Sequence, residues 1–491
     1  MTEWQPFVIL EAELRRIEDR LLIDPDDIQT RFDRANLLNC LGRPDDARTA
    51  YLDLLSRSPT HFGALNNLAA LLSATGFTTA AKLAYVEAVK HHPNNPVGHL
   101  HLANALAMAG DSEASFRHFE MALELDPHMP ETHQGLSKLF TDLGDEENAR
   151  AHRVKGFRDR PLMVVPYRGK QFPISLLVLD SAIGGSVPIQ NHIDNQIFLT
   201  SVLFVDFCDP DFPLPPHHLV FNAIGDADLA QSSLAAAERI LSRTAAPVIN
   251  LPSAVRQTGR AANAQRFRNI DGVLTPKMEQ LSRSALLGKL GKSNLEKSGF
   301  RFPLLVRSPG FHTGKYFARV ESASQLVSSI SQLPGDELLV MESLDACGSD
   351  GKYRKYRVMV IDREIYPLHL AVSSNWKVHY FTADMQSSAE YRAEDEAFLT
   401  RMPQILGPRA IKALGAICDQ LQLDYAGIDF GLDQQGNLLL FEANATMVVN
   451  PPETDVRWNY RRGPVQAILE AIRRLLTTRI HSKERLFRGA A

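Results

Sequence analysis

The sequence predicts a multidomain protein in which an all-α repeat array is followed by an α/β domain and then by an α+β domain. Three observations predict this order. Residues of one kind recur every 34 positions in the first third, the next segments alternate apolar strands with a helical pattern, and the rest is rich in short β-forming runs. We place the boundaries at 1–161, 172–255 and 256–480, with a basic tail at 481–491.

The 34-residue period joins glycines, prolines, small residues and aromatic residues. They are Gly42, Gly76, Gly110 and Gly144; Pro25, Pro59, Pro93, Pro127 and Pro161; Ala35, Ala69, Ala103 and Ser137; and Tyr51, Tyr85 and Phe119. Small residues let two helices approach closely, glycine permits the turn between them, and proline ends the second helix. This order resembles the tetratricopeptide repeat, a two-helix unit, and implies a superhelix of four repeats.

Both ends of the array depart from this pattern. Pro25 continues the phase backwards, so residues 3–24 are interpreted as the second helix of a degenerate capping repeat. In the last repeat, Arg153 stands where the aromatic residue belongs. Such a change suits a terminal repeat that packs on another domain.

Repeat arrays of this kind present a concave surface to peptides or proteins, so we expect a peptide or protein partner. Asn36, Asn67 and Asn104 lie on the first helices of their repeats and are placed to hydrogen-bond an extended peptide. The alternative, which is the more common case, is that they are ordinary polar surface positions or contacts within the array.

The composition excludes several classes of protein. A net charge of −4 gives no reason to expect a nucleic-acid or membrane partner, and a solvated helix end explains the basic tail. Four cysteines without CxxC spacing argue against a disulfide framework or a zinc site. Acidic residues precede any apolar run that could serve as a signal segment, and no apolar run is long enough to span a membrane. We expect a soluble, cytoplasmic protein.

The middle segments predict an open parallel sheet. Apolar runs at 174–181, 218–226 and 246–252 are typical of buried strands, and 227–243 has a helical pattern. Strand–helix–strand order favours a Rossmann-like sheet. No GxGxxG motif is present, which argues against a dinucleotide site.

The last part predicts an antiparallel sheet. Its strands are expected at 303–308, 316–320, 337–343, 355–362 and 364–373, followed by an amphipathic helix at 411–423 and a hairpin at 425–433 and 438–445. Glu442 and Asn444 are two apart and share one strand face, and Asp429 lies on the partner strand. Two carboxylates and an amide oxygen suit Mg²⁺ that also holds phosphate. The alternative is a solvent-facing side of the hairpin.

Upstream residues suit a phosphate-binding lobe. Arg307 ends a strand, and Gly310, Gly314 and Lys315 form a loop whose charge and backbone N–H groups can clamp a polyphosphate. The segment Glu342, Ser343, Leu344 and Asp345 follows the next strand, where it can bind adenine and ribose.

The order of these features over about residues 172–478 resembles the ATP-grasp superfamily, nearest to the carboxylate–amine ligases such as ribosomal-protein glutamate ligase and D-alanine–D-alanine ligase. The resemblance implies an α/β pre-ATP-grasp domain and an α+β ATP-grasp domain that binds ATP with Mg²⁺ or Mn²⁺ at Asp429, Glu442 and Asn444. It also implies an amide-forming ligase that acts through an acyl phosphate, with Arg357 and Lys377 near the reacting groups. Two departures are Arg307 in place of the family's usual lysine, and Lys355 in place of an acid.

The sequence leaves several points open. Arg260, Arg266, His312 and His379 are further candidates for contact with phosphate or substrate, or are ordinary structural residues. The activated acid, the attacking amine or amino acid, the number of additions and the oligomeric state are not determined. A nucleotide-binding scaffold that mediates protein interactions and a small-molecule kinase on the same fold are the alternative functions.

Overall fold

The computed structural model describes residues 5–287, 291–309, 311, 314–378, 383–452 and 455–488. The chain divides into two compact units. The first comprises Met1–Leu177 and Ile193–His217, and the second comprises Val178–His192 and His218–Ala491. Each unit is described by itself.

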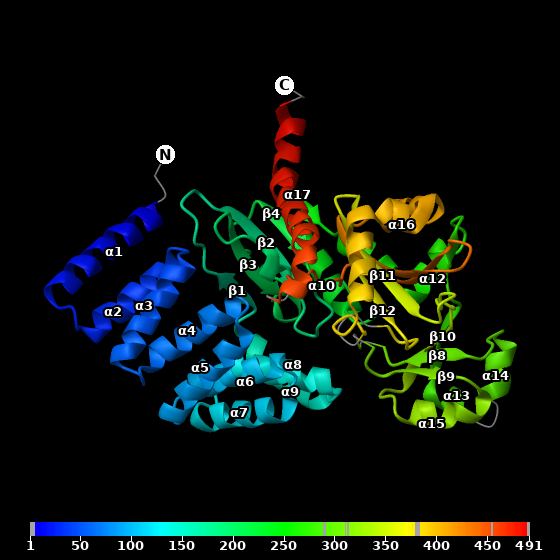
Figure 1. The fold of residues 1–491 in the computed structure, drawn as a ribbon, viewed down its shortest axis with the longest axis horizontal. Coiled ribbons are helices and arrows are strands. Elements are labelled where there is room, and N and C mark those ends of the chain that lie inside the picture. The colour runs from blue at the N-terminus through cyan, green and yellow to red at the C-terminus, as the bar shows by residue number, and fades with distance from the viewer. Residues whose placement is uncertain are drawn as a thin grey trace. The chain divides into compact units, whose positions relative to one another are not determined.

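The first unit begins with nine successive helices in the described part of the chain, drawn in blue to cyan (Figure 1). They are α1 (Gln5–Ile23), α2 (Ile28–Cys40), α3 (Pro44–Arg57), α4 (Phe62–Ala74), α5 (Thr78–His91), α6 (Pro96–Met108), α7 (Ser112–Leu125), α8 (Pro130–Leu143) and α9 (Glu146–Phe157). The helices of each predicted repeat, such as α2 with α3 and α8 with α9, pack against one another. They fit a tetratricopeptide superhelix, so the predicted repeat fold is confirmed.

The residues that recur every 34 positions adopt the turn conformations and the burial that the repeat pattern predicts. The glycines at the turns all adopt positive φ, between 70° and 88°. The small and aromatic residues are buried, with Ala35, Ala69 and Tyr51 at 0% exposure. Arg153, which replaces the aromatic residue of the last repeat, is also buried and donates to Glu146 and Thr141. Later in this unit, Phe157 at the end of α9 packs its ring on Phe204.

The first sheet has five strands in the order β1-β3-β2-β4-β5. They are β1 (Leu162–Val165), β2 (Ile174–Asp180), β3 (Phe198–Phe204), β4 (Leu219–Asn222) and β5 (Val248–Ile249), accompanied by η1 (Ile189–His192), η2 (Val205–Phe207) and α10 (Gln231–Leu241). β4 and β5 are parallel across α10, as predicted. The prediction of a parallel sheet is correct for β4 and β5 but not for the whole sheet, because β1 pairs antiparallel with β3. Neither of these two strands was expected.

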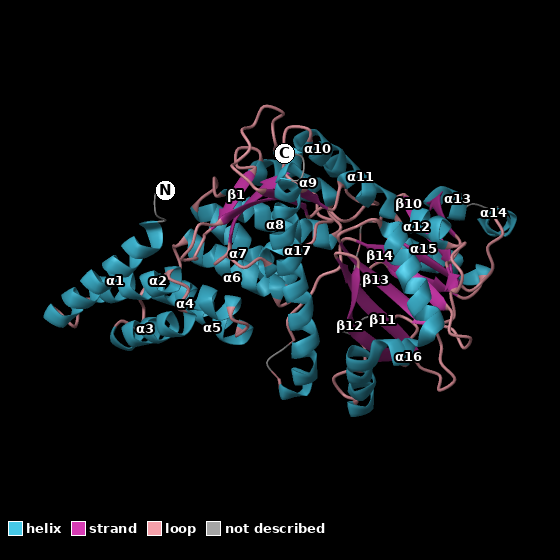
Figure 2. Cartoon of the chain, turned by 90° about the horizontal axis from the view of Figure 1, so that it is seen from above, coloured by secondary structure: helices cyan, strands magenta, loops and turns pink. Residues whose placement is uncertain are grey.

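The second unit contains two further sheets, where one antiparallel sheet is expected from the sequence. The small sheet has the order β7-β10-β8-β9, and the large sheet has the order β12-β11-β13-β14-β6. Their strands are β6 (Val273–Leu274), β7 (Met278–Ser282), β8 (Leu304–Arg307), β9 (Phe317–Val320), β10 (Glu337–Glu342), β11 (Tyr353–Ile361), β12 (Glu364–Ser373), β13 (Tyr425–Leu432) and β14 (Leu438–Asn444). Figure 2 shows β11 to β14 side by side in magenta.

Helices accompany these sheets. They are α11 (Pro252–Val255), η3 (Arg256–Thr258), α12 (Arg260–Phe267), α13 (Arg283–Leu287), α14 (Gly291–Lys297), η4 (Ala323–Gln325), α15 (Leu326–Ser331), α16 (Ala389–Leu421), η5 (Val456–Arg461) and α17 (Arg462–Arg488). The helix predicted at 411–423 is the last part of α16, which is interrupted at Arg401 and Gly407 near two prolines. None of the helices in the described ranges has the length and apolar character needed to cross a membrane.

Asn250 joins the first sheet to the large sheet inside the second unit. It follows β5 with a φ of 57°, and its Oδ1 accepts from the backbone N–H groups of Asp424 and Tyr425 at 2.9 and 3.0 Å. Its Nδ2 donates to the Tyr425 carbonyl at 2.7 Å. One buried amide thus satisfies the backbone where β13 begins, which fixes the start of the strand that carries Asp429.

Candidate functional site

Four chemically active side chains form one row across the large sheet. His369 on β12 is the register partner of Arg357 on β11, Arg357 is the partner of Asp429 on β13, and Asp429 is the partner of Glu442 on β14. Register partners in neighbouring strands place their side chains on the same face of a sheet. The strand register therefore places Asp429 and Glu442 side by side, with Arg357 and His369 continuing the row on β11 and β12.

The strand pairing is irregular at both ends of this row of four side chains. The register between β11 and β12 shifts between Arg357 and Val358, and the register between β13 and β14 shifts between Asp429 and Phe430. An extra residue in one strand bends it and re-aims the neighbouring side chains, and such bulges recur next to active sites. The two irregularities therefore lie next to Arg357 and Asp429, where they can change the direction of these side chains.

Asp429 is held by two cations. Arg357 Nε lies 2.5 Å from Oδ1 and Arg357 Nη2 lies 2.7 Å from Oδ2, while Lys355 Nζ lies 3.0 Å from Oδ2. Burial opposes the charged form of Asp429, but Arg357 and Lys355 outweigh this and hold its pKa well below the usual range. Asp429 is therefore a carboxylate at neutral pH, with both oxygens engaged.

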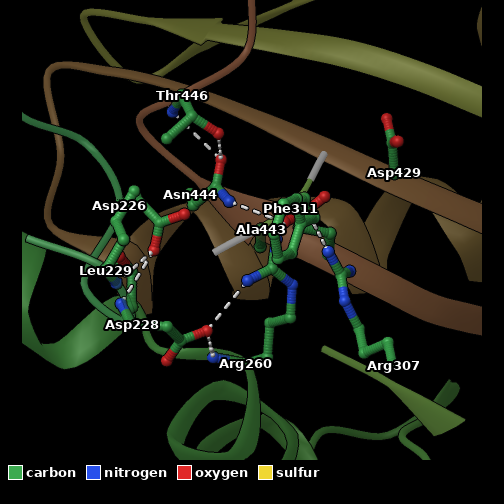
Figure 3. A network of polar contacts seen from close by, with 12 residues as sticks. Asp226, Asp228, Leu229, Arg260, Arg307, Phe311, Asp429, Ala443, Asn444 and Thr446 are labelled. Carbon is green, nitrogen blue, oxygen red and sulfur yellow. Dashed lines mark hydrogen bonds and ion pairs between the residues drawn. The ribbon is translucent and has the colours of Figure 1, made fainter. Parts of the chain in front are cut away.

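Glu442 is held by a different arginine. Arg260 Nη2 lies 2.5 Å from Glu442 Oε1, and Arg260 Nη1 lies 2.9 Å from Asp228 Oδ2. Asn444 Nδ2 donates to the same Oε1 of Glu442 at 2.9 Å. The Asn444 Oδ1 accepts from the backbone N–H and the hydroxyl of Thr446. Figure 3 shows this network, with Asp429 standing apart from it.

The loop after β4 contributes acids to the same place. Asp226 Oδ1 accepts from the backbone N–H groups of Asp228 and Leu229 at 2.8 and 3.0 Å, which orders the loop. A Cβ on Gly225 would lie 2.5 Å from the carbonyl carbon of Ala445, so this loop touches the turn after β14 backbone to backbone. Glycine at 225 is therefore required for the close approach.

Arg307 brings a second arginine close to Arg260. It ends β8, and its Nη2 donates to the carbonyl of Phe311. Its Nε is buried and has no hydrogen-bond partner within the described part of the chain. Burial, followed by the charge of Arg260, lowers the pKa of Arg307 to about 10. Figure 3 shows both side chains extending in the same direction from separate elements. Two neighbouring arginines, one with an unused donor, are suited to an anion.

A small pocket, with room for about one water molecule, lies between the small and large sheets. Its lining comes from η3, α12, β14 and the segment that enters β7: Thr258, Arg260, Asn263, Ala264, Pro276, Met278, Leu440, Phe441, Glu442 and Ala443. Asn263 is buried, donates to the carbonyls of Thr258 and Ala443, and has an Oδ1 without a partner in the described residues. The pocket therefore combines apolar walls with an arginine, a carboxylate and an unused amide acceptor.

The segment predicted to bind adenine and ribose is tied to the entry of β7. Glu342 Oε2 accepts from the backbone N–H of Lys277 at 2.9 Å, and the Glu342 N–H donates to the Lys277 carbonyl at 3.0 Å. Asp345 accepts from the backbone N–H of Cys347. Ser343 and Leu344 lie between them, and none of the residues 342–345 lines the pocket. Lys277 does adjoin the pocket, because Pro276 and Met278 line it.

The glycine loop and Lys377 lie together. Gly314 has a φ of 73°, and a Cβ there would come 2.6 Å from Lys377 Cε. Burial lowers the pKa of Lys377. Lys315 places its Nζ 5.0 Å from the centre of the Tyr316 ring. Gly310, His312 and His379 lie outside the described residues. Lys377 follows β12 and lies beside the predicted phosphate loop, and its Nζ is 3.5 Å from the Phe317 carbonyl on β9.

The donor set of the predicted metal site is of the kind that Mg²⁺ or Mn²⁺ accepts, namely carboxylate and amide oxygens on one strand face. Within the described ranges, no group of three or more His, Cys, Asp or Glu side chains is arranged to hold a metal ion. The site therefore depends on Asn444 as a third donor. Cations contact both acids, and Asn444 also donates to Glu442, so an ion would displace some of these contacts.

Several residues at the site were missed or left open by sequence reasoning. The sequence leaves Arg260 as one of four open candidates for contact with phosphate or substrate, and it does not single out Asp226, Asp228, Asn263 or His369. The sequence GDADL at 225–229, which follows a predicted strand, was a signal that acids lie at a strand end. Arg266, also left open, packs over the Phe267 ring, with Nη1 buried and without a partner in the described residues. The peptide-binding interpretation of Asn36 and Asn67 is not favoured, because Asn36 accepts from Tyr51 and Asn67 inside the array.

No protein-family model and no curated protein matches the chain. Among solved structures, the chain is similar to MamA of Desulfovibrio magneticus RS-1, with 22% identity, a TM-score of 0.28, and coverage of 30% of this chain and 84% of that chain. It is also similar to a thermophilic TPR protein of Thermus thermophilus, with 21% identity, a TM-score of 0.27, and coverage of 31% and 84%. A tetratricopeptide repeat protein of Parabacteroides merdae gives 15% identity, a TM-score of 0.29, and coverage of 31% and 60%.

Proposed function

We propose that the second unit is an ATP-grasp type carboxylate–amine ligase that forms an amide through an acyl phosphate. The observation that carries the proposal is the pocket between the two sheets, whose polar end is Glu442 and Arg260. Glu442 is also the last member of the row that contains Asp429 and Arg357. A nucleotide pocket that opens on paired carboxylates and arginines suits phosphoryl transfer, because that chemistry depends on positioning and on charge.

The lining of the pocket suits a nucleotide base among apolar groups, and the pocket would have to widen to admit it. Met278, Leu440 and Phe441 provide apolar surface, and the Oδ1 of Asn263 can accept an N–H from a base. Arg260 and Arg307 then face the phosphates, where the unused Nε of Arg307 can donate. The backbone N–H groups near Gly314, together with Lys315 and Lys377, would add donors for the terminal phosphate.

The proposed divalent ion would be held by Asp429, Glu442 and Asn444. When bound, Mg²⁺ or Mn²⁺ would supply positive charge to the phosphate oxygens during transfer. Arg357 lies at the centre of the row, in contact with Asp429, and is placed to stabilise the transferred phosphoryl group or the reacting carboxylate.

The reaction balances with ATP, a carboxylate and an amine. A carboxylate oxygen of the substrate attacks the γ-phosphorus, which breaks the bond to the β-phosphate oxygen and releases ADP. The amine nitrogen then attacks the acyl carbon, forms the C–N bond, and expels inorganic phosphate while one proton is lost. Phosphorylation is needed because a carboxylate alone lacks a good leaving group. The chain provides fixed positive charge and orientation for both steps.

The repeat array supports a large substrate. Tetratricopeptide superhelices present a concave surface that suits peptides and proteins. We therefore propose that the acid or the amine belongs to a peptide, a protein or a carrier-bound group that the array recruits, and that the second substrate is a small amine or amino acid.

The test is to incubate the full chain with ATP, Mg²⁺ and pools of amino acids or peptides, and to follow ADP release and new masses. Glu442→Gln should abolish turnover, whereas Glu470→Gln on the exposed side of α17 should not change it. A product heavier by an amide-linked group, with free phosphate, supports ligation. A phosphorylated product would instead indicate a kinase, and nucleotide binding without any turnover would indicate a scaffold.

A further inference from the structure

Both carboxylate oxygens of Asp429 are in contact with a cation, either Lys355 or Arg357. Lys355 Nζ contacts Oδ2, and Arg357 contacts both Oδ1 and Oδ2, at distances of 2.5 to 3.0 Å. Asp429 is only 3% exposed, so water cannot screen these contacts strongly. Two positive charges thus act on one buried negative charge.

A divalent ion at Asp429 would meet these cations directly. The ion would need an Asp429 oxygen that Lys355 or Arg357 now uses, and it would lie within a few ångströms of both positive groups. Glu442 presents the same difficulty, because Arg260 contacts its Oε1. An ion that arrived alone would leave these cations partly buried and without their carboxylates, which is costly.

A polyphosphate that binds with the ion would offset the cost of leaving the buried cations without their carboxylates. Its oxygens carry several negative charges, so they can accept Lys355 and Arg357 when the metal ion takes the carboxylate. Each cation then exchanges one anionic partner for another. Arginine suits the bidentate contact with phosphate, and lysine can follow as a mobile point charge.

We infer that Lys355 and Arg357 make divalent-ion binding at Asp429 depend on a nucleoside triphosphate that binds with the ion. This inference rests on the proposed function, and it assigns a role to Lys355, the position at which the sequence departs from the acid that the ATP-grasp resemblance implies. Binding of the ion and binding of the nucleotide are then positively coupled, and the coupling is the same in both directions.

Lys355 is the better residue to test, because Arg357 makes two contacts and belongs to the proposed catalytic row. Replacing Lys355 with methionine keeps most of its aliphatic length and removes the competing charge. Lys412→Met is the matched control, because Lys412 is 77% exposed and its ion pair, with Asp271, is remote in sequence from this site.

The experiment measures Mn²⁺ binding to the full chain by electron paramagnetic resonance, without nucleotide and with a non-hydrolysable ATP analogue. In the wild-type chain, the analogue should tighten Mn²⁺ binding by about tenfold or more. Lys355→Met should tighten Mn²⁺ binding without nucleotide by about tenfold and reduce the effect of the analogue. Lys412→Met should behave as the wild type.

The outcomes separate the two proposals. If the analogue enhances Mn²⁺ binding equally in the wild type and in Lys355→Met, the role of Lys355 is wrong and the nucleotide site stands. If Mn²⁺ binds to neither protein, with or without the analogue, the proposed function itself fails. Should Lys355→Met not fold, Lys355→Gln is measured in its place, and the same shift is required of it.

Discussion

Asp429 and Glu442 face each other across β13 and β14, yet each carboxylate is held by a different arginine from a different element. Arg357 on the neighbouring strand β11 holds Asp429, and Arg260 on α12 holds Glu442. Two acids this close would repel each other if both were unpaired. The two arginines therefore offset the repulsion between the two acids on one face of the sheet.

The first prediction concerns the pair of Arg260 and Glu442. Arg260→Met should destabilise the second unit by about 2–3 kcal/mol, below the full cost of breaking a buried pair because Asp228 and Glu442 are 31% and 21% exposed. Adding Glu442→Gln to Arg260→Met should cost much less than the sum of the two single changes, because the contact is lost only once. Urea unfolding of the four proteins measures this. Additive effects would show that the contact contributes nothing to stability.

The register of this site could be predicted from sequence, whereas its arginine partners could not. Alternation along a strand places Glu442 with Asn444, and a short turn folds Asp429 back beside them. Arg260 lies 182 residues from Glu442 in the chain, and neither residue has a local pattern that indicates the other. Only the packing of α12 against β14 brings them together.

The repeat array was predictable in more detail than the sheets. A fixed period repeats one structural unit four times, so the glycine at the turn and the buried small residue each appear four times in the sequence. The sheets have no such repetition. β1 and β6 are short, and β6 is paired by only two residues, so their local sequence gives little signal. The division of the C-terminal strands into two sheets depends on long-range pairing that a run of β-forming residues does not specify.

The second prediction concerns pH and the histidine pairs of the array. His133 and His152 place their Nδ1 atoms 2.9 Å apart, and His99 and His118, one period earlier, place theirs 3.0 Å apart. Burial, then the charges of His133 and Lys155, lowers the pKa of His152 to about 4. Burial likewise lowers the pKa values of His133 and His118.

The sign of the effect follows from these pKa values. An unfolded histidine titrates near 6.5, so the unfolded array takes up protons first as the pH falls, and the folded array loses stability between about pH 6.5 and 4. Hydrogen exchange of the α8 and α9 amides, corrected for the intrinsic rate, should therefore show weaker protection at pH 5 than at pH 7.5. His152→Phe should reduce that difference, since the ring can still pack on Phe140. An unchanged difference in this variant would exclude the histidine pair as its source.

The third prediction concerns Gly225, which lets the loop that carries Asp226 and Asp228 approach the turn after β14. A Cβ there would lie 2.5 Å from the Ala445 carbonyl carbon and oxygen and 2.9 Å from the Thr446 nitrogen. These are backbone atoms that cannot rotate away, so Gly225→Ala must displace the loop or the turn. We expect a loss of about 1–3 kcal/mol in unfolding free energy.

The same displacement should weaken the site, because Arg260 is held between Asp228 on this loop and Glu442 on β14. Nucleotide affinity, measured by calorimetry at a temperature where the variant is folded, should fall together with stability. Gly415→Ala is the control: Gly415 lies in α16 with no atom near a Cβ position, and alanine there should stabilise by about 0.5–1 kcal/mol without altering the affinity. If Gly225→Ala loses stability but binds nucleotide as the wild type does, the loop supports the fold alone, and Asp228 has no part in positioning Arg260 for the ligand.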